Sequence, residues 1–138
     1  MREADLCFTS RVIKAGTAEG EALVSPEPIG FLGGVDGETG VVTERGHSLE
    51  GQCVAGKVLV FPTGKGSTVG SYVLYQLAAA GRAPAAIVNA ESEPIVAVGA
   101  IIAGIPMVDR VPIEALETGD FLRLEEGQLR VWRAGEER

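Results

Sequence analysis

Three short apolar runs, separated by two segments with helical character, constrain the fold more than any other feature of the sequence. The runs are 56–61 (GKVLVF), 84–89 (PAAIVN) and 105–109 (IPMVD). Short apolar runs without polar alternation are typical of strands buried on both faces, as in a parallel sheet. The order therefore predicts a β-α-β-α-β unit in which helices pack against a parallel sheet.

The two segments between these runs are predicted to be helices. Residues 67–81 carry apolar side chains at helical spacing and end on Gly81. Residues 93–104 form a shorter apolar segment that ends on Gly104. Glycine is the common residue just after the last turn of a helix, because it adopts a left-handed conformation without strain.

The chain on either side of this unit is predicted to be rich in strands and turns. Short strands are expected in 6–16 and 19–25, a glycine-rich loop with short strands in 27–42, and a closing hairpin in 120–133 that turns at Glu126-Gly127. The whole chain, residues 1–138, is expected to form one α/β domain with a mixed sheet and flanking helices.

Composition excludes several classes of function. The net charge of −7 argues against a nucleic-acid-binding face and against an anionic membrane surface. No apolar run is long enough to span a bilayer, which predicts a soluble, cytoplasmic protein. Cys7 and Cys53 lie 46 residues apart and form no C-x-x-C pair, so we expect two buried thiols and no metal site.

The turn PTGKGST, residues 62–68, joins a predicted strand to a predicted helix and is the strongest candidate site. Gly66 permits close approach of the backbone, and either Ser67 or Thr68 is a natural N-cap. The first N–H groups of the helix and the Lys65 ammonium favour a bound anion. A nucleotide-binding P-loop is excluded, because Lys65 is followed by glycine rather than by Ser or Thr. A purely structural turn stays an equal alternative on local sequence alone.

A second glycine-rich loop, FLGGVDGETG at 31–40, is a candidate for contact with a ligand or a partner. Gly33, Gly34 and Asp36 are the residues of this loop that we single out. The alternative is a surface turn in which Asp36 caps a hairpin.

Two further side chains are candidates for chemistry. His47 is the only histidine, and it lies in a polar loop without a visible orienting partner, which makes a metal role unlikely and leaves a role as general base open. Arg110 follows a strand, where it can hold a substrate carboxylate through two hydrogen bonds. A surface ion pair is an equal alternative for Arg110.

With these residues laid out, three blocks resemble the small, swivel-domain subunit of the aconitase X family. They are 22–40 (ALVSPEPIGFLGGVDGETG), 60–109 (from VFPTGKGSTVGSYVLYQLAAAG to GIPMVD) and 119–124 (GDFLRL). The resemblance covers roughly residues 15 to 132, and the combination of the glycine-rich blocks makes it specific.

The resemblance implies a swivelling β/β/α domain, like the fourth domain of aconitase, that docks on a larger subunit with a cysteine-held [4Fe-4S] cluster. It implies dehydration of (R)-5-phosphomevalonate to trans-anhydromevalonate 5-phosphate in the archaeal mevalonate pathway of isoprenoid synthesis. A bacterial branch of the family dehydrates cis-3-hydroxy-L-proline instead. By the same resemblance Ser67 corresponds to the proposed catalytic base.

These expectations assign roles to the singled-out residues. We expect Ser67 to be catalytic, Lys65, Gly66, Thr68 and Arg110 to bind substrate, and Gly33, Gly34 and Asp36 to face the site or the partner. No cofactor is expected on this chain. Two alternatives remain: Ser67 is only a hydrogen-bonding group, or the chain is a non-catalytic module that binds an anion or a protein. Phosphohistidine carriers share the architecture, but the loop around His47 fits them poorly.

Overall fold

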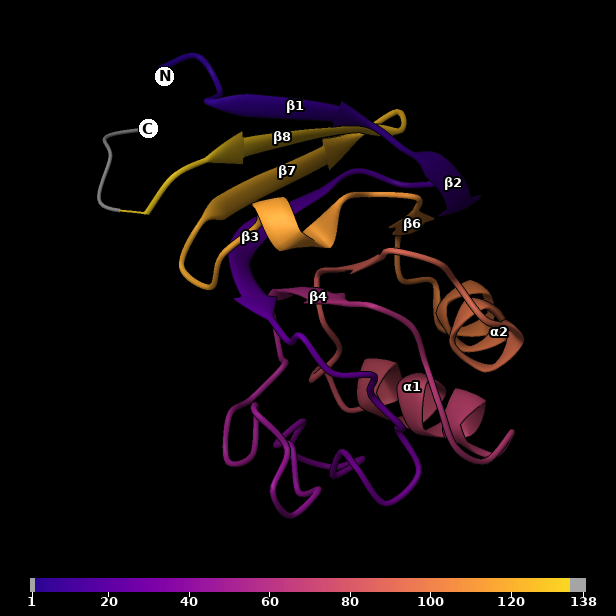
Figure 1. Ribbon diagram of the computed structural model, residues 1–138. Helices are drawn as coiled ribbons and strands as arrows, with labels where there is room; N and C mark the ends of the chain where they lie inside the picture. The colour runs from indigo at the N-terminus through magenta and orange to yellow at the C-terminus, as the bar shows by residue number, and fades with distance from the viewer. Residues whose placement is uncertain (1, 135–138) are drawn as a thin grey trace.

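One mixed sheet of eight strands forms the frame of the computed structural model, which describes residues 2–134 (Figure 1). The strand order across the sheet is β1-β8-β7-β3-β4-β5-β6-β2. The strands are β1 (Leu6–Thr9), β2 (Arg11–Lys14), β3 (Ala18–Val24), β4 (Val58–Phe61), β5 (Ala86–Asn89), β6 (Met107–Asp109), β7 (Phe121–Glu125) and β8 (Gln128–Trp132). The helices are α1 (Gly70–Ala79), α2 (Pro94–Ala103) and a short 3₁₀ turn, η1 (Ile113–Ala115).

The central part of the sheet is parallel, as the three apolar runs predict. β4 pairs with the end of β3 on one side and with β5 on the other, and β5 pairs with β6. The four parallel strands β3, β4, β5 and β6 therefore end at the same edge of the sheet. The β-α-β-α-β prediction is confirmed, and this edge is where parallel α/β sheets place their sites.

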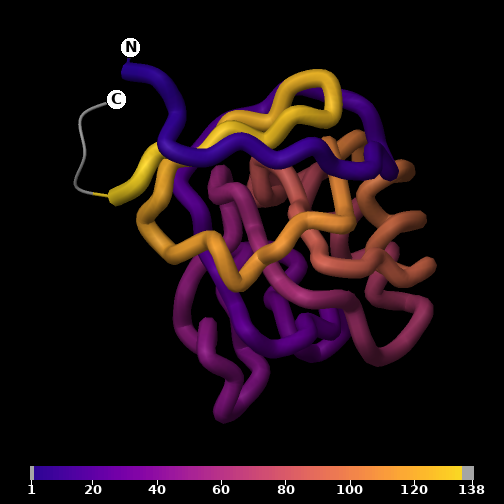
Figure 2. Tube along the Cα trace, turned by 45° about the horizontal axis from the view of Figure 1, so that its top comes forward, coloured from indigo at the N-terminus to yellow at the C-terminus, as the bar shows by residue number. Residues whose placement is uncertain are grey.

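The remaining strands are antiparallel: β7, β8 and β1 lie beyond β3, and β2 pairs with β6 at the opposite edge. β7 and β8 form the predicted hairpin, and its turn residues Glu126 and Gly127 both have positive φ. The first half of β3 pairs with β7, whereas its second half pairs with β4. Figure 2 shows the hairpin and β1 running together across one side of the molecule, with the helices away from them.

Alternating side chains of the central strands feed two separate apolar cores. Leu59, Phe61 and Ile87 point toward α1 and α2, whereas Val60 and Val88 point toward η1 and the hairpin. These five side chains are buried completely. Because both faces of the parallel strands are covered, the strands carry continuous apolar runs.

The helices end where the sequence predicts and begin later. Gly81 and Gly104 follow the two helices in the left-handed conformation, with φ of 71° and 73°. The prediction that Ser67 or Thr68 caps the first helix is wrong: α1 begins at Gly70, its N-cap position is Val69, and no side chain caps it. Within residues 2–134 no helix has both the length and the apolar character needed to cross a membrane.

The two cysteines differ from the expectation of buried thiols. Cys7 is exposed and Cys53 is half-buried, and both are free. Cys7 lies on β1, an edge strand whose side chains alternate between partly covered and exposed, and it falls on the exposed face. Its position on the strand, which composition does not reveal, therefore decides its exposure.

An ion pair between the partly exposed Arg11 and the buried Asp109 fixes the other edge strand, β2. Asp109 is fully buried at the end of β6 and accepts hydrogen bonds from Nε and Nη2 of Arg11 at 2.8 and 2.6 Å. The backbone N–H of Ser92 donates to the same carboxylate at 2.9 Å. The Arg11 guanidinium is the main cause that lowers the pKa of Asp109 to about 2 from the ordinary 3.8.

Replacing Asp109 by Asn is expected to lower the free energy of unfolding by about 2 kcal/mol at pH 7. The folded-state pKa lies below the unfolded value, so this contribution is complete above about pH 4 and disappears as the pH falls through about 2. Denaturant unfolding of the wild type and Asp109→Asn between pH 7 and 2 measures the difference. A difference that stays constant down to pH 2 would contradict the assignment.

Glu19→Gln provides the control. Its partner contact, from Arg123 at 3.2 Å, lies on the surface. Surface pairs contribute less than about 1 kcal/mol, so this variant is expected to unfold almost like the wild type at every pH.

Candidate functional site

The turn between β4 and α1 lies at the carboxyl edge of the parallel strands. In Figure 1 this segment leaves β4 and reaches the margin of the molecule beside the two helices. Ser67 is exposed, and its Oγ accepts a hydrogen bond from the backbone N–H of Val69 at 3.2 Å. Lys65, Gly66 and Thr68 are exposed with it.

The donors that this turn offers differ from those expected. The first N–H groups of the helical segment bond to carbonyls inside the turn: Gly70 to Ser67, Ser71 to Thr68 and Tyr72 to Val69. They are therefore not available to an anion. In the part of the chain that the structure describes, the N–H groups of Gly66, Ser67 and Thr68 have no acceptor. With Gly66 at φ 90°, consecutive N–H groups of this kind form an anion-binding concavity.

A close backbone approach holds the turn against the start of α2. A Cβ atom on Gly64 would collide with the Glu93 carboxylate and come within 2.5 Å of Val96 Cγ2. Glu93 is fixed there because it caps α2, accepting hydrogen bonds from the N–H groups of Ile95 and Val96 at 2.8 and 2.7 Å. Only glycine fits between the turn and this cap.

The second glycine-rich loop packs on the other side of the turn. Ile29 and Gly64 form an isolated parallel bridge, and the N–H of Lys65 donates to the carbonyl of Ile29 at 3.1 Å. A Cβ on Gly30 would lie 3.1 Å from the carbonyl oxygen of Lys65. The structure thus brings together the two glycine-rich blocks that the sequence singles out separately.

Gly33, Gly34 and Asp36 lie in this second loop, and their contacts are local. Gly33 is exposed with φ 79°, and a Cβ on Gly34 would collide with the carbonyl oxygen of Gly30. The Asp36 carboxylate accepts from the N–H groups of Glu38 and Thr39, which lower its pKa. These contacts agree with the alternative of a capped surface turn, and a role toward a partner stays a prediction.

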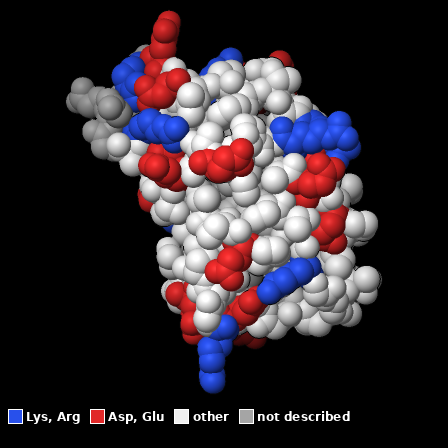
Figure 3. Space-filling view, in the orientation of Figure 1, with Lys and Arg blue, Asp and Glu red and all other residues white. Residues whose placement is uncertain are grey.

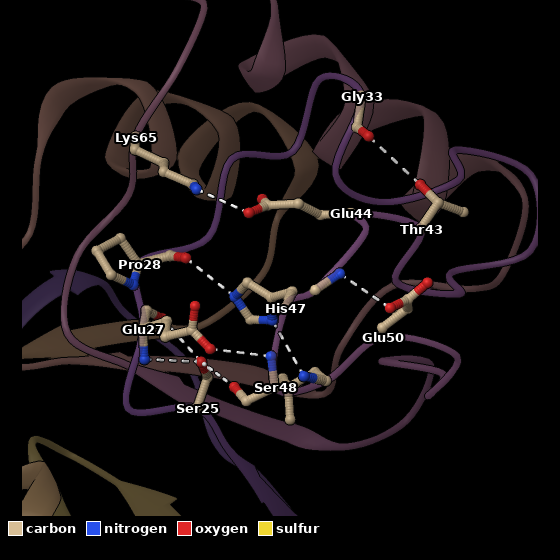
Figure 4. A network of polar contacts seen from close by, with 12 residues as sticks. Ser25, Glu27, Pro28, Gly33, Thr43, Glu44, His47, Ser48, Glu50 and Lys65 are labelled. Atoms are coloured by element: carbon tan, nitrogen blue, oxygen red, sulfur yellow. Dashed lines mark hydrogen bonds and ion pairs between the residues drawn. The ribbon is translucent and has the colours of Figure 1, made fainter.

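Lys65 is paired with Glu44, a residue that the sequence analysis did not single out. Its Nζ lies 2.9 Å from Glu44 Oε2, and both side chains are partly exposed (Figure 4). The ammonium therefore points toward the loop that contains Glu44 in this state. A single glutamate in a polar loop gives no local signal, so only the fold reveals the pair.

His47 is a structural residue rather than a free base. It is buried, its Nδ1 accepts from the N–H of Leu49 at 3.0 Å, and its Nε2 lies 3.0 Å from the carbonyl oxygen of Pro28 (Figure 4). The first contact requires an Nδ1 without a hydrogen atom, so the hydrogen atom is on Nε2. Nε2–H therefore donates a hydrogen bond to the carbonyl oxygen of Pro28. The expectation that His47 lacks an orienting partner is wrong, because both ring nitrogens are occupied.

Arg110 lies at the same edge of the sheet but is held to β5 rather than to the Ser67 turn. Its backbone N–H donates to the carbonyl of Ala90 at 3.0 Å, and its φ is 60°. Asp109 pairs with Arg11, and no ion pair of Arg110 forms among the described residues, so the alternative of a surface ion pair is not seen there. The exposed guanidinium remains a candidate for substrate binding.

Asn89 ends β5 beneath the turn and was missed by the sequence analysis. It is fully buried, and its Nδ2 donates to the carbonyl of Phe61, the last residue of β4, at 3.0 Å. Its Oδ1 is the one buried side-chain polar atom among the described residues without a hydrogen-bond partner. The sequence signal that could have identified Asn89 was its position as the single polar residue at the end of the apolar run AIVN.

A hollow at this edge lies apart from Ser67. Its volume is about 470 Å³, and its lining is mostly apolar, with Ser25 and Glu114 as polar members. Pro62 is the only residue of the 62–68 turn that lines it. The hydroxyl of Ser25 is occupied by the backbone of Glu27. The exposed 62–68 turn, which carries polar groups without partners, is therefore the stronger candidate for the site than this mostly apolar hollow.

The described residues contain no arrangement that could hold a metal ion. No three His, Cys, Asp or Glu side chains gather among residues 2–134. Cys7 lies on β1 and Cys53 in the loop before β4. Two separate thiols do not fit an iron–sulfur cluster, which is usually held by several cysteines.

Comparison with known proteins gives one consistent result. Residues 7–131 match the family model described as the aconitase X swivel domain. The chain is 56% identical to the phosphomevalonate dehydratase small subunit of Methanosarcina mazei, over 94% of this chain and 93% of that protein. It is 54% identical to the protein of the same name from Thermococcus gammatolerans, over 88% of this chain and 94% of that one.

Two solved structures are similar over nearly the whole chain. A chain of the holo-form of Thermococcus kodakaraensis aconitase X has a TM-score of 0.91 and 51% identity, over 93% of this chain and 99% of that chain. The solution structure of a UPF0107 protein has a TM-score of 0.85 and 50% identity, over 93% of this chain and 100% of that chain.

Gly64→Ala is expected to destabilise the domain by about 1–3 kcal/mol, because the added methyl displaces the Glu93 cap and Val96. Thermal and denaturant unfolding measure the change. Gly70→Ala is the matched control: its Cβ would meet neighbours at 3.4 Å or more, and alanine suits a helix. Equal stability of the two variants would contradict the account of the turn.

Proposed function

The chain belongs to the aconitase X swivel-domain family, and from that premise we propose that it is the small subunit of a phosphomevalonate dehydratase. The observation that carries this proposal is the identity of 53–61% to small subunits of that name, over 81–94% of this chain and 82–96% of each relative. The reaction is the removal of water from (R)-5-phosphomevalonate to give trans-anhydromevalonate 5-phosphate, a step of the archaeal mevalonate pathway.

Loss of water from a 3-hydroxy acid requires two chemical functions. A base takes the weakly acidic proton from the carbon next to the carboxylate, and an acid assists departure of the hydroxyl group as water. The Ser67 turn supplies candidates for the first function. Nothing among residues 2–134 supplies ligands for an iron–sulfur cluster, so we place the [4Fe-4S] cluster expected for the family in the large subunit.

We propose that Ser67 takes the proton through Oγ. For this step the exposed hydroxyl first gives its own proton to solvent water, and the N–H of Val69, which donates to Oγ at 3.2 Å, stabilises the alkoxide that results. Hydrogen bonds to the charged form favour an alkoxide, as they do for other oxyanions. The alternative is that Ser67 only donates a hydrogen bond to the substrate.

The neighbouring groups are proposed to bind the anionic ends of the substrate. The N–H groups of Gly66 and Thr68 point to no acceptor among the described residues, and they suit a carboxylate or phosphate. Lys65 would exchange its contact with Glu44 for the substrate anion. Arg110, exposed at the same edge, is the second cation proposed for this role.

Two other functions remain as outcomes of the test. A dehydratase of cis-3-hydroxy-L-proline would keep the mechanism and change the substrate. A swivel module that binds an anion or a protein without chemistry would keep the fold alone. Anaerobic assays of the reconstituted pair with both substrates distinguish them: water loss from 5-phosphomevalonate supports the proposal, and turnover of the proline derivative alone overturns it.

Ser67→Ala is expected to lower kcat by about 100-fold or more while leaving assembly with the large subunit intact. Ser71→Ala is the matched control, since it removes a hydroxyl one turn away that bonds only to the carbonyl of Thr68. It is expected to keep kcat within about threefold. Unchanged kcat in Ser67→Ala would remove Ser67 from the chemistry.

A further inference from the structure

Both helices of the domain lack charge, which is unusual for helices with an exposed face. None of residues 66–81 and 94–108 is Asp, Glu, Lys or Arg, in a chain where 22% of residues are charged. A helix with one face on a core normally carries charged and polar side chains on the opposite face. Here the opposite face is apolar instead.

Six large apolar side chains are exposed on this side. Tyr72 is 67% exposed and Tyr75 is 54% exposed, both on α1. We call the whole set the helix surface: Val69, Tyr72, Tyr75, Val98, Ile101 and Ile102. Soluble monomers rarely expose so many apolar side chains together, and such patches usually mark interaction sites.

The helix surface is one surface rather than two stripes. Gly99 of α2 lies against Ser71 and Leu74 of α1, and a Cβ there would come within 2.6 Å of Leu74. A hollow of about 160 Å³ lies between the beginnings of the helices and is lined by Thr68, Ser71, Pro94, Ile95 and Val98. Val98 of the helix surface lines this hollow together with Thr68 and Ser71, which directly precede Val69 and Tyr72 in the sequence.

The helix surface is continuous with the candidate site. Thr68, in the wall of the hollow, is the residue after Ser67, and Val69 follows it. Leu32, half exposed in the glycine-rich loop, has its backbone nitrogen 3.4 Å from the Cβ position of Gly70. Figure 1 draws the end of the 62–68 turn at the lower right margin of the molecule. At the same margin in Figure 3 the surface atoms are white, the colour of residues other than Lys, Arg, Asp and Glu.

We propose that the helix surface is the contact through which this chain binds the large subunit of the dehydratase. The inference rests on the proposed function, in which Ser67 acts on a substrate held by the partner. A partner that closes over Ser67 must also cover the residues on both sides of it, which begin the helix surface. Tyrosine, isoleucine and valine without charge are the composition of a stable interface core.

A second copy of this chain is the competing occupant, and the position of Ser67 argues against it. A homodimer through the helix surface would cover the turn from Thr68 onward in the absence of the large subunit. A homodimer would therefore block the approach of the large subunit and its substrate to Ser67. An apolar surface on the large subunit would bury the exposed side chains of the helix surface. It would also bring the substrate held by the large subunit to Ser67.

The test uses the complete two-subunit protein and a matched pair of variants. Ile102→Glu places a charge in the helix surface, and Val12→Glu places the same charge at a side chain of the same 46% exposure, on β2. Val12 is not part of the helix surface, and its side chain lies beside Gly127 of the hairpin turn. Tyr72→Ser is a second surface variant that adds no charge. Circular dichroism of each isolated small chain verifies folding.

Calorimetric titration into the large subunit is expected to give an affinity at least about tenfold weaker for Ile102→Glu and Tyr72→Ser, and within about twofold of wild type for Val12→Glu. Hydrogen exchange of the wild-type pair is expected to protect α1 and α2 on assembly. Wild-type affinity of both helix-surface variants, without that protection, would overturn the proposal. A wild-type small chain that is a dimer through this surface, with Ile102→Glu monomeric, would also overturn it.

Failure of this inference and failure of the proposed function give different results. If the wild-type pair dehydrates 5-phosphomevalonate but the helix-surface variants assemble normally, the function stands and the surface is wrong. If the variants fail to assemble and the wild-type pair is inactive on that substrate, the surface stands and the function is wrong.

Discussion

The position of Ser67 depends on one close backbone approach, that of Gly64 to the Glu93 cap of α2. Glu93 holds the start of α2, Gly64 fits against it without a side chain, and Ile29 bridges to Gly64 from the other side. Three segments that are distant in the sequence therefore meet at the turn. The parallel strands beneath them end at one edge, so the sheet and these contacts together support the turn.

Most of the fold could be predicted from the sequence because its elements depend on local patterns. The strands around Leu59, Ile87 and Val108 are buried on both faces, which gives continuous apolar runs, and glycines with positive φ end both helices. The start of α1 could not be predicted, because the N–H groups of Gly70, Ser71 and Tyr72 bond to backbone carbonyls of the turn rather than to a capping side chain. The short turn η1 was also missed, since three residues carry no periodicity.

The candidate site could be predicted only in part, because chemistry-bearing residues were given their partners by tertiary structure. His47 is occupied at both ring nitrogens, and Lys65 is paired with Glu44 across the fold. The exposed Ser67 and the N–H groups of Gly66 and Thr68 remain available, and the proposed function uses them as half of the site. The absence of charge from both helices was visible in the sequence, but its meaning needed the exposed face that the structure assigns to Tyr72 and Ile101.

A titration of this chain into a fixed amount of the reconstituted large subunit, with 5-phosphomevalonate as substrate, tests the central claim most directly. If this chain completes the site, the rate of water loss rises from near zero and reaches its limit when the two chains are equimolar. A large subunit that is fully active alone, with no response to added small chain, would contradict the account.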